Sequence, residues 1–412
     1  QYTGQNYIYF FLCLIVESSK FNYYNNNIKM NIFIKIIIII IFSIILNAEK
    51  LVAAEKIKIG LLVPLSGQHQ TTGKLILQSV RLAINKINNP DIEILPKDTK
   101  ADPMVTFKAA KELGQNGIKI IIGPVFNQNL VYLDELKDII FLSLTNKTIK
   151  NPKNVISVGI NAYSQLRAII NFQESNNLTE TIFLLPKSDY EDEIRKAIPK
   201  TNIKIKKLHI YDSDPTKLTK QIENITKYQE RKLDLKREIE KLKNSDVPNK
   251  NRKIQKLEKK DTLGKVNFDS VIIADFDESL KSITTSLLYT DVSPEEVYFI
   301  TLNQWFDTSL LKEKSCQPLY FPSIDKENYD KFSKEYYSAF KEYPNQLSII
   351  SYDLIGLIYY LIYQNNFIID KKLFIRKNKF KGKIGFFEIK ENKVSHILNI
   401  YKIEDNNFKK IF

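Results

Sequence analysis

The chain has 412 residues, of which 43% are apolar and 26% are charged, and its formal net charge is +14. This composition excludes a disordered chain, and the length allows two or three domains that each have a core. Lys, Asn and Ile recur along the whole chain. We therefore attribute the charge to composition bias and predict no nucleic-acid partner.

The N-terminal part predicts export. Residues 1–29 precede the first methionine and are interpreted as a non-native upstream segment. Residues 30–54 have the pattern of a secretory signal peptide, with Lys35 just before an apolar run over 36–46. We expect cleavage after Ala54, which leaves a periplasmic mature chain with no stable membrane anchor. The alternative is an uncleaved anchor, because apolar segments of variable length can enter a membrane.

Cysteine use is sparse. Of the two cysteines, Cys13 and Cys316, only Cys316 lies in the predicted mature part. A single cysteine cannot close an intramolecular disulfide. No cysteine follows the apolar run at the position of a lipid-attachment signal, so the sequence predicts no lipid anchor.

From residue 57, short apolar runs alternate with longer amphipathic segments. The apolar runs predict strands at 57–63, 92–95, 118–122 and 139–142. The amphipathic segments predict helices at 72–87, 104–113 and 127–136. This alternation is typical of a parallel sheet with helices on both faces.

A second series of the same kind follows. Its predicted helices span 163–174, 189–197 and 278–289, and its predicted strands span 181–185, 203–210, 271–274 and 297–301. We therefore predict an α/β fold of two doubly wound parallel-sheet lobes around a cleft. The first lobe is expected to hold 55–160 and 302–385, and the second 161–301 and 386–412. Ligands of such sheets bind beyond the carboxyl ends of the strands, so the site is expected in the cleft.

Residues 216–260 interrupt the second series. They contain 15 Lys/Arg against seven Asp/Glu, and their apolar residues recur at spacings of three and four up to a break near Pro248. This pattern predicts a helical hairpin with a narrow apolar seam, inserted in the second lobe. We expect that replacing 219–259 with a short linker spares the fold. The hairpin is either a docking arm for another protein or a solvated structural arm.

Several segments resemble leucine-binding-like periplasmic binding proteins of type I. Residues 59–67, followed by Gly73, resemble the opening strand and loop of that family, and 121–125 resemble its turn after the third strand. The segment 184–190 is also similar, although Glu191 stands where the family usually has Gly. Later similarities lie at 352–355 and at 382–387. The resemblance covers residues 55–412 and implies the two-lobed fold.

A narrower resemblance concerns the insertion. In the penicillin-binding protein activator branch found in alphaproteobacteria, a charged helical insertion is followed by two short motifs. Here the insertion is followed by similar motifs at 261–264 and 268–271, and 305–311 is similar to a loop of that branch. This resemblance implies a regulator of peptidoglycan synthesis.

Ten polar residues at predicted strand ends are candidates for contacting a small polar ligand. They are Ser66, His69, Gln70, Asn127, Gln128, Ser143, Thr145, Asn146, Tyr190 and Asp275. Asn127 is expected at a helix start, where free backbone N–H groups can hold an anion. Asp275 and the nearby Asp277 could accept a hydrogen bond from an ammonium group. The alternative for each residue is ordinary loop capping.

The resemblance argues against one ligand class. Amino-acid binders of the family carry small hydroxyl residues after strands three and four. Here Asn127 stands in the first of these places, beside the bulky Phe126. This departure puts amino-acid binding in doubt.

No catalytic or metal-binding motif is present in the sequence. The three histidines, His69, His209 and His396, lie at no metal-ligand spacing from a cysteine or an acidic pair. The nucleotide-binding, hydrolase and metalloprotease motifs are absent. We therefore predict a non-enzymatic protein with no cofactor and no metal.

Two functions follow from these observations. The first is a periplasmic regulator that binds a peptidoglycan synthase, motivated by the insertion and the motif at 261–264. The alternative is the solute-binding receptor of an importer for amino acids or similar small polar ligands, whose partners are the importer's membrane subunits. The lobe architecture motivates this alternative.

Overall fold

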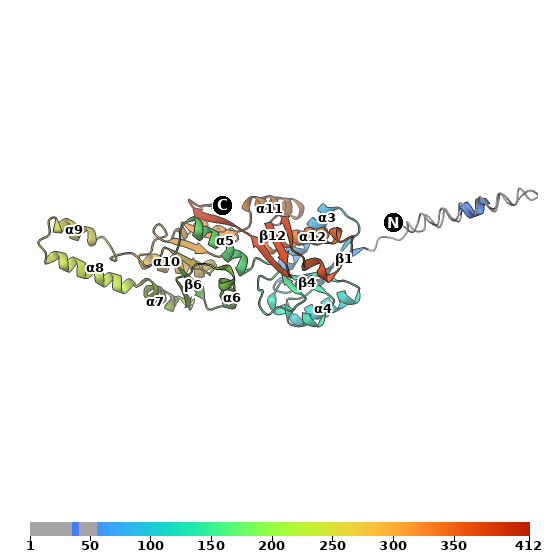
Figure 1. The fold of residues 1–412 in the computed structure, drawn as a ribbon, viewed down its shortest axis with the longest axis horizontal. Coiled ribbons are helices and arrows are strands. Elements are labelled where there is room, and N and C mark those ends of the chain that lie inside the picture. The colour runs from blue at the N-terminus through green and yellow to red at the C-terminus, as the bar shows by residue number, and fades with distance from the viewer. Residues whose placement is uncertain (1–34, 41–55) are drawn as a thin grey trace, which may run out of the picture. The chain divides into compact units, whose positions relative to one another are not determined.

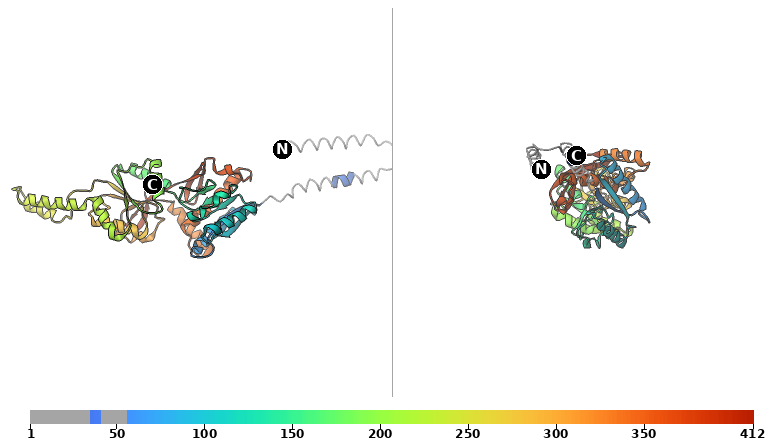
Figure 2. Two further views of the ribbon diagram at one scale, coloured as in Figure 1. Left: turned by 90° about the horizontal axis from the view of Figure 1, so that it is seen from below. Right: turned by 90° about the vertical axis from the view of Figure 1, so that its right-hand side faces the viewer.

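The computed structural model describes residues 35–40 and 56–412 (Figures 1 and 2). Residues 35–40, inside the predicted signal peptide, are helical, and Ile36 to Ile40 are exposed. Residues 1–29, the other residues of the predicted signal peptide and its predicted cleavage site lie outside the described residues. Residues 57–412 form one compact unit, which the following paragraphs describe.

The first lobe is built on a five-stranded parallel sheet, as the sequence predicts. In spatial order its strands are β2 (Ile92–Asp98), β1 (Ile57–Val63), β3 (Ile120–Ile122), β4 (Ile140–Ser143) and β5 (Val155–Ser157). Alternate residues of β3 enter different cores: Ile120 and Ile122 belong to one hydrophobic cluster and Ile121 to the other. Both faces of the sheet are therefore covered, which explains the nearly continuous apolar runs of its strands.

Helices α3 (Gln70–Ile87) and α4 (Pro103–Gln115) contact β1 and supply residues to these two different clusters. The predicted helix over 127–136 is instead two short 3₁₀ turns, η2 (Asn127–Leu130) and η3 (Leu133–Glu135). Buried side-chain bonds accompany these turns: Asn129 Nδ2 donates to Thr106 Oγ1, 2.9 Å away. A turn this short has no helix dipole of the expected strength, so the anion site predicted at Asn127 loses its basis.

Helix α12 (Gln346–Gln364) packs on α3 in the first lobe, although it is far away in the sequence. By length and composition it could cross a membrane, yet 61% of its apolar window is buried inside the protein. Eleven of its residues are buried, including Ile349, Leu354 and Ile358. We interpret it as a core helix of this lobe. Helix α11 (Lys326–Phe340) also contacts α3, and Tyr336 Oη donates to Leu75 O at 2.9 Å.

The second lobe is built on a seven-stranded sheet. In spatial order its strands are β15 (Asn407–Lys410), β14 (Asn399–Glu404), β10 (Leu319–Ser323), β9 (Tyr298–Thr301), β8 (Ser270–Ile273), β6 (Thr181–Pro186) and β7 (Lys207–Tyr211). The strands from β10 to β7 run parallel, and β14 and β15 pair antiparallel at one edge. The accompanying helices are α5 (Ala162–Ser175), α6 (Glu191–Thr201), α7 (Pro215–Thr226) and α10 (Asp277–Tyr289).

One predicted lobe boundary is wrong. Residues 302–385 were expected in the first lobe, but β10 pairs with β9 and β14 in the second sheet. Two short turns, η4 (Thr308–Leu311) and η5 (Lys314–Cys316), connect β9 to β10. A buried apolar strand has the same pattern in either lobe, so its sequence does not reveal which sheet it joins.

The insertion is also shorter than predicted. Helix α7 belongs to the body of the second lobe, because it contacts α10 and because Leu218 and Ile222 lie in the main hydrophobic core. The hairpin consists only of α8 (Tyr228–Lys243) and α9 (Lys250–Leu257), which pack against each other and extend beyond α7 and α10 in Figure 1. The expectation that 219–259 can be removed without harm is therefore not supported.

A small antiparallel sheet of β11 (Asn378–Gly382), β12 (Gly385–Lys390) and β13 (Lys393–Ile397) follows α12 and the turn η6 (Lys371–Phe374). Asp353 on α12 holds its first hairpin turn, accepting hydrogen bonds from Lys383 N at 2.7 Å and Ile384 N at 2.8 Å. A Cβ on Gly382 would lie 2.1 Å from Asp353 Oδ2, so this turn requires glycine. Two of the segments that carry the family resemblance are thus contact partners.

The lobes are joined where the chain passes between the sheets. It crosses between β5 and α5, between β10 and α11, and between β13 and β14. His396 on β13 contacts the first crossing, with Nε2 2.9 Å from Val158 O. Glu193 on α6 adds a contact, accepting hydrogen bonds of 2.8 Å from Thr148 N, Thr148 Oγ1 and Ile149 N of the first lobe.

Candidate functional site

A cleft of about 630 Å³ lies between the lobes. Its lining combines residues from strand ends, helix starts and the first crossing: Asn146, Ile160, Gln165, Tyr190, Phe276, Asp277, Asn303, Gln304, Trp305, Asp307 and Gln346. Asn146 and Gln346 come from the first lobe, and most of the others come from the second. The cleft therefore lies where ligands of open parallel sheets bind.

The loop after β9 forms one wall of the cleft and is held by a hydrogen-bonded network. Asn303 N donates to Gln165 Oε1 at 2.9 Å. Asn303 Oδ1 in turn accepts from Trp305 N at 2.9 Å and from Ser323 Oγ at 2.8 Å. These bonds fix the backbone from which the indole of Trp305 projects.

A second set of bonds joins this loop to the end of β8. Gln304 Nε2 donates to Asp275 O at 3.1 Å and to Thr301 Oγ1 at 3.0 Å. The Asp275 carboxylate accepts from Tyr211 Oη at 2.5 Å. Burial raises the pKa of Asp275, and the bond from Tyr211 opposes that rise. Asp275 therefore positions the lining residue Gln304 through its backbone carbonyl and is not itself among the lining residues.

Three residues at this wall have a left-handed backbone. Asp277, Trp305 and Phe306 have φ values of +50°, +47° and +59°. Residues with a Cβ rarely adopt this left-handed region, and bulky aromatic residues there are uncommon. Such strain persists only where the surrounding structure imposes it, and it is characteristic of ligand-binding sites.

Two polar atoms near the cleft lack a hydrogen-bond partner in the described structure. They are Tyr190 Oη and Asn303 Nδ2, and both are buried. Burial raises the pKa of the Tyr190 phenol well above its usual value, and the charge of Glu193 adds to that rise. Unsatisfied buried polar groups are costly, so their occurrence beside a cleft is a second indication of a binding site.

Comparisons with known proteins agree with this geometry. Residues 56–222 match the family model for periplasmic binding proteins. The chain has a type I periplasmic binding protein fold. The predicted leucine-binding-like resemblance and the predicted fold class are thus confirmed. The search of curated proteins gives no match.

Solved structures of two functional kinds are similar to this chain. The C-domain of LpoA from Haemophilus influenzae, a regulator of PBP1A, is 15% identical, with a TM-score of 0.57 over 86% of this chain and 100% of that one. A putative branched-chain amino acid ABC transporter protein from Rhodospirillum rubrum is 12% identical, with a TM-score of 0.66 over 86% and 100%. A solute binding protein from Rhodopseudomonas palustris, solved with 3,4-dihydroxy benzoic acid, is 15% identical, with a TM-score of 0.56 over 87% and 97%. At these identities the similarity shows the fold alone.

Of the ten residues predicted to contact a ligand, Asn146 and Tyr190 line the cleft. The three after β1 lie on the first lobe outside this lining. Ser66 Oγ donates to Asp98 Oδ2 at 2.6 Å, and the His69 ring packs on Phe126 with centroids 4.6 Å apart. Gln70 is exposed at the start of α3.

Most of the predicted residues after β3 and β4 form hydrogen bonds with backbone groups of loops. Ser143 is fully buried, and its Oγ donates to Pro124 O at 2.9 Å. Thr145 Oγ1 accepts from Lys147 N at 3.2 Å. Gln128 is exposed and donates to Ala101 O at 3.4 Å, while Asn127 Oδ1 is buried without a partner. Ligand contact by these residues stays a prediction.

The sequence analysis missed most of the cleft lining. Gln165, Asn303, Gln304 and Gln346 were not proposed, and Trp305 was noted only for its family resemblance. The loop from 303 to 307 directly follows β9, so the strand-end rule would have found it if applied to that strand. Gln346 starts a helix far along the sequence, and no local signal places it at the cleft.

Among the described residues, no group of three or more His, Cys, Asp or Glu side chains could hold a metal ion. His209 lies in β7, where burial lowers its pKa. Cys316 is buried in the second lobe, and burial raises the pKa of its thiol.

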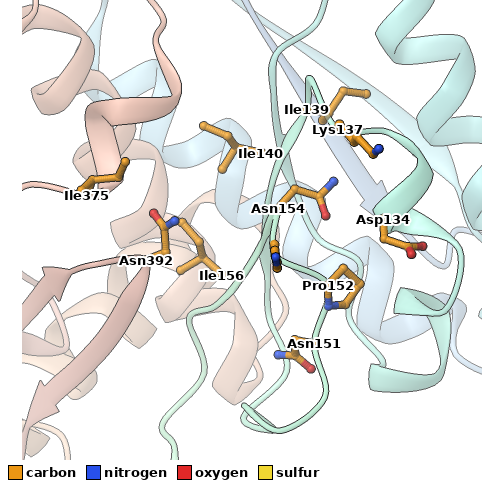
Figure 3. Close-up of a pocket in the computed structure, with 11 residues that line it drawn as sticks. Asp134, Lys137, Ile139, Ile140, Asn151, Pro152, Asn154, Ile156, Ile375 and Asn392 are labelled. Carbon is orange, nitrogen blue, oxygen red and sulfur yellow. The ribbon is translucent and has the colours of Figure 1, made fainter.

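A second hollow lies beside β5, the edge strand of the first sheet (Figure 3). Its lining includes Ile140 and Ile156 from the first sheet, and Ile375 and Asn392 from the C-terminal part of the chain. It is separate from the cleft, since the two linings share no residue.

Proposed function

We propose that this chain is a non-enzymatic, exported binding protein that regulates a peptidoglycan synthase by docking through the α8–α9 hairpin. The observation that carries the proposal is the hairpin itself, which is added to an otherwise complete two-lobed fold. The likeness to a domain of a PBP1A regulator supports it.

A docking arm has to be held rigidly at its base, and buried contacts provide this. The Arg231 guanidinium donates to Thr226 O at 3.1 Å, to Thr262 Oγ1 at 3.0 Å and to Thr290 O. Tyr228 Oη donates to Asp261 Oδ2 at 2.6 Å. The base of the hairpin is therefore hydrogen-bonded to the motif at 261–264, which motivated the regulator hypothesis.

The part of the hairpin beyond this base is basic. Lys236, Arg237, Lys241, Lys253 and Lys256 are exposed along α8 and α9. Leu233 is 51% exposed on α8 and offers an apolar contact beside them. Such a surface fits an acidic face of a partner protein, where charge complementarity guides association and a few apolar side chains add affinity.

The test is capture from envelope extract with the mature protein as bait. The wild type is expected to recover a peptidoglycan synthase. A variant in which residues 236–258 are replaced by a short Gly/Ser linker is expected to lose it, because the base of the hairpin is kept and the docking surface is not. Recovery of an importer's membrane subunits, with no synthase, would contradict the proposal.

The interlobe cleft favours a second candidate, the solute-binding receptor of an importer. Thermal-shift screening separates the two. A ligand present at 100 times its Kd stabilises the folded protein by about 2.7 kcal/mol. A shift of the melting temperature with one of the common amino acids supports the receptor, and no shift with any of them argues against amino-acid transport.

A further inference from the structure

The cleft lining has an unusual chemical composition for this chain. Five of its eleven residues are amides, two are carboxylates, and three are the aromatic residues Tyr190, Phe276 and Trp305. No Lys, Arg or His lines it, although the chain has 61 Lys and Arg. A strongly basic protein thus has a cleft whose charged lining groups are acidic.

This composition disfavours an anionic ligand. A bound carboxylate needs a cation or several free hydrogen-bond donors, because its lost hydration has to be replaced. The hydroxyl groups after β4 do not meet this need. Ser143 Oγ is buried and bonded to Pro124 O, and Thr145 Oγ1 accepts from Lys147 N. The carboxylates of Asp277 and Asp307 would repel a second negative charge.

The same lining suits a ligand with many hydroxyl groups. A hydroxyl group both donates and accepts, and a side-chain amide offers both complementary roles in one plane. Asn146, Gln346 and Asp277 are exposed, and none is among the side chains that the described hydrogen bonds and ion pairs engage. Their polar groups therefore need not break a protein bond in order to bind a ligand.

Aromatic surface completes the site. Phe276, just before α10, is 39% exposed, and Trp305, in the loop after β9, is half-buried. A flat aromatic side chain can bury the apolar C–H face of a sugar ring. Amide groups alone would leave that face exposed to water. The hydrogen bond from Trp305 N to Asn303 Oδ1 and the left-handed backbone fix the main chain that carries the indole before a ligand enters.

We propose that this cleft binds an uncharged saccharide, with hydroxyl or N-acetyl groups on the amides and a ring face on Trp305 or Phe276. The proposal goes beyond the synthase-regulator role and does not depend on it. It would make the cleft a sensor of a sugar, while the hairpin remains the surface for the partner protein.

Trp305 is the chain's one tryptophan, so its fluorescence reports on the cleft directly. The experiment titrates the mature protein with glucose, N-acetylglucosamine and N,N′-diacetylchitobiose, and with leucine, glutamate and spermidine for comparison. We expect a saturable change in tryptophan emission with at least one saccharide, and a matching isotherm by calorimetry. The proposal is overturned if no saccharide binds up to about 10 mM, which is weaker than most specific affinities. It is also overturned if only an amino acid or only spermidine binds.

Variants place the ligand within the cleft. The double variant Asn146→Ala/Gln346→Ala should weaken saccharide binding about tenfold or more, as expected for the loss of two hydrogen bonds. Gln115→Ala, which changes an exposed amide at the end of α4 and outside the lining, is the matched control and should leave the affinity unchanged. Asp277→Asn should keep saccharide affinity within about threefold, because an amide still bonds a hydroxyl. Unchanged affinity in the double variant contradicts the assignment, and synthase capture by the same variant tests the regulator role separately.

Discussion

Single buried carboxylates make contacts between segments that are far apart in this chain. Glu193 is 5% exposed and receives three hydrogen bonds from the loop at Thr148 and Ile149. It is the side chain that ties α6 of the second lobe to the first. Its loss removes three hydrogen bonds to a charged acceptor, and such bonds contribute more than the mean value of a hydrogen bond.

We predict that Glu193→Ala lowers the free energy of unfolding by about 2–3 kcal/mol, because three hydrogen bonds to the carboxylate, all of them between the lobes, are lost. Asp192→Ala is the matched control, since Asp192 is exposed in the same helical turn. Its effect is expected to stay within about 0.5 kcal/mol. Urea unfolding followed by circular dichroism measures both, and equal effects of the two substitutions would refute the role of Glu193.

Two buried titratable groups make opposite contributions to stability in one pH range. Burial raises the pKa of Asp353 from 3.8 to about 7, against the opposing hydrogen bonds from Ile384 and Lys383. Burial lowers the pKa of His396 from 6.5 to about 4. Asp353 is easier to protonate in the folded state, and the resulting contribution to the free energy of unfolding is complete below pH 3.8. It is lost as the pH rises through 7. The His396 contribution is complete above pH 6.5 and is lost as the pH falls through 4.

We predict that, when one of the two groups is removed, the pH dependence of the free energy of unfolding is set by the other group. Relative to the wild type, Asp353→Asn should gain free energy of unfolding as the pH rises from 4 to 7, and His396→Gln should lose it. Each difference should span about 3 kcal/mol, from the size of the pKa shifts. Urea unfolding at a series of pH values is the measurement. If the free energy of unfolding changes with pH in the same way in the wild type and both variants, neither group is buried as described.

At the scale of elements, the hairpin and α7 differ in what they bury. Leu218 and Ile222 of α7 are 3% and 0% exposed in the core, whereas α8 and α9 bury mainly Leu235 and Ile254 against each other. Removing a core helix costs the burial of several large side chains, at roughly 1.5–3 kcal/mol each. Removing a two-helix arm whose ends lie close costs little more than loop closure.

We predict that a Gly/Ser replacement of 236–258 keeps a single cooperative unfolding transition and loses no more than about 2 kcal/mol of stability. A replacement of 219–259, which also removes Ile222, Tyr228 and Arg231, should abolish that transition or the soluble protein. Thermal and urea unfolding of the two variants give the comparison. If both variants fold equally well, α7 is not part of the core.

At the scale of the whole molecule, neither lobe is a continuous stretch of chain. The first sheet ends at β5, but α12, which covers α3 on that sheet, lies about 190 residues later in the sequence. Its buried side chains include Ile349, Leu354 and Ile358, and α3 is the element that it contacts most extensively. The late segment is therefore required for the stability of the early one.

We predict that residues 57–157 expressed alone show no cooperative unfolding transition, because the α12 face of α3 is left in water. Co-expression with residues 324–397 should restore a soluble complex, since that segment supplies α11, α12 and the small sheet. Size-exclusion chromatography and circular dichroism give the readout. A stable, cooperatively folding 57–157 fragment would show that α12 is dispensable.

The sequence by itself determined the repeating strand and helix pattern, the two parallel sheets, the presence of a helical insertion, and the location of a cleft beyond the strand ends. These depend on local periodicity: apolar runs buried on both faces predict parallel strands, and spacings of three and four predict helices. Asn146 and Tyr190 were found at the cleft because each follows a strand of its own lobe.

Only the tertiary structure decided which elements and side chains meet. The apolar pattern of β10 fits either sheet, and the pattern of α7 fits either the hairpin or the core. An apolar pattern shows that a segment is buried but does not show which element buries it. Gln346 reaches the cleft through the packing of α12 on α3, and the Gln165–Asn303 bond joins residues 138 positions apart. Contacts over such separations depend on how the whole chain packs, and no local pattern encodes them.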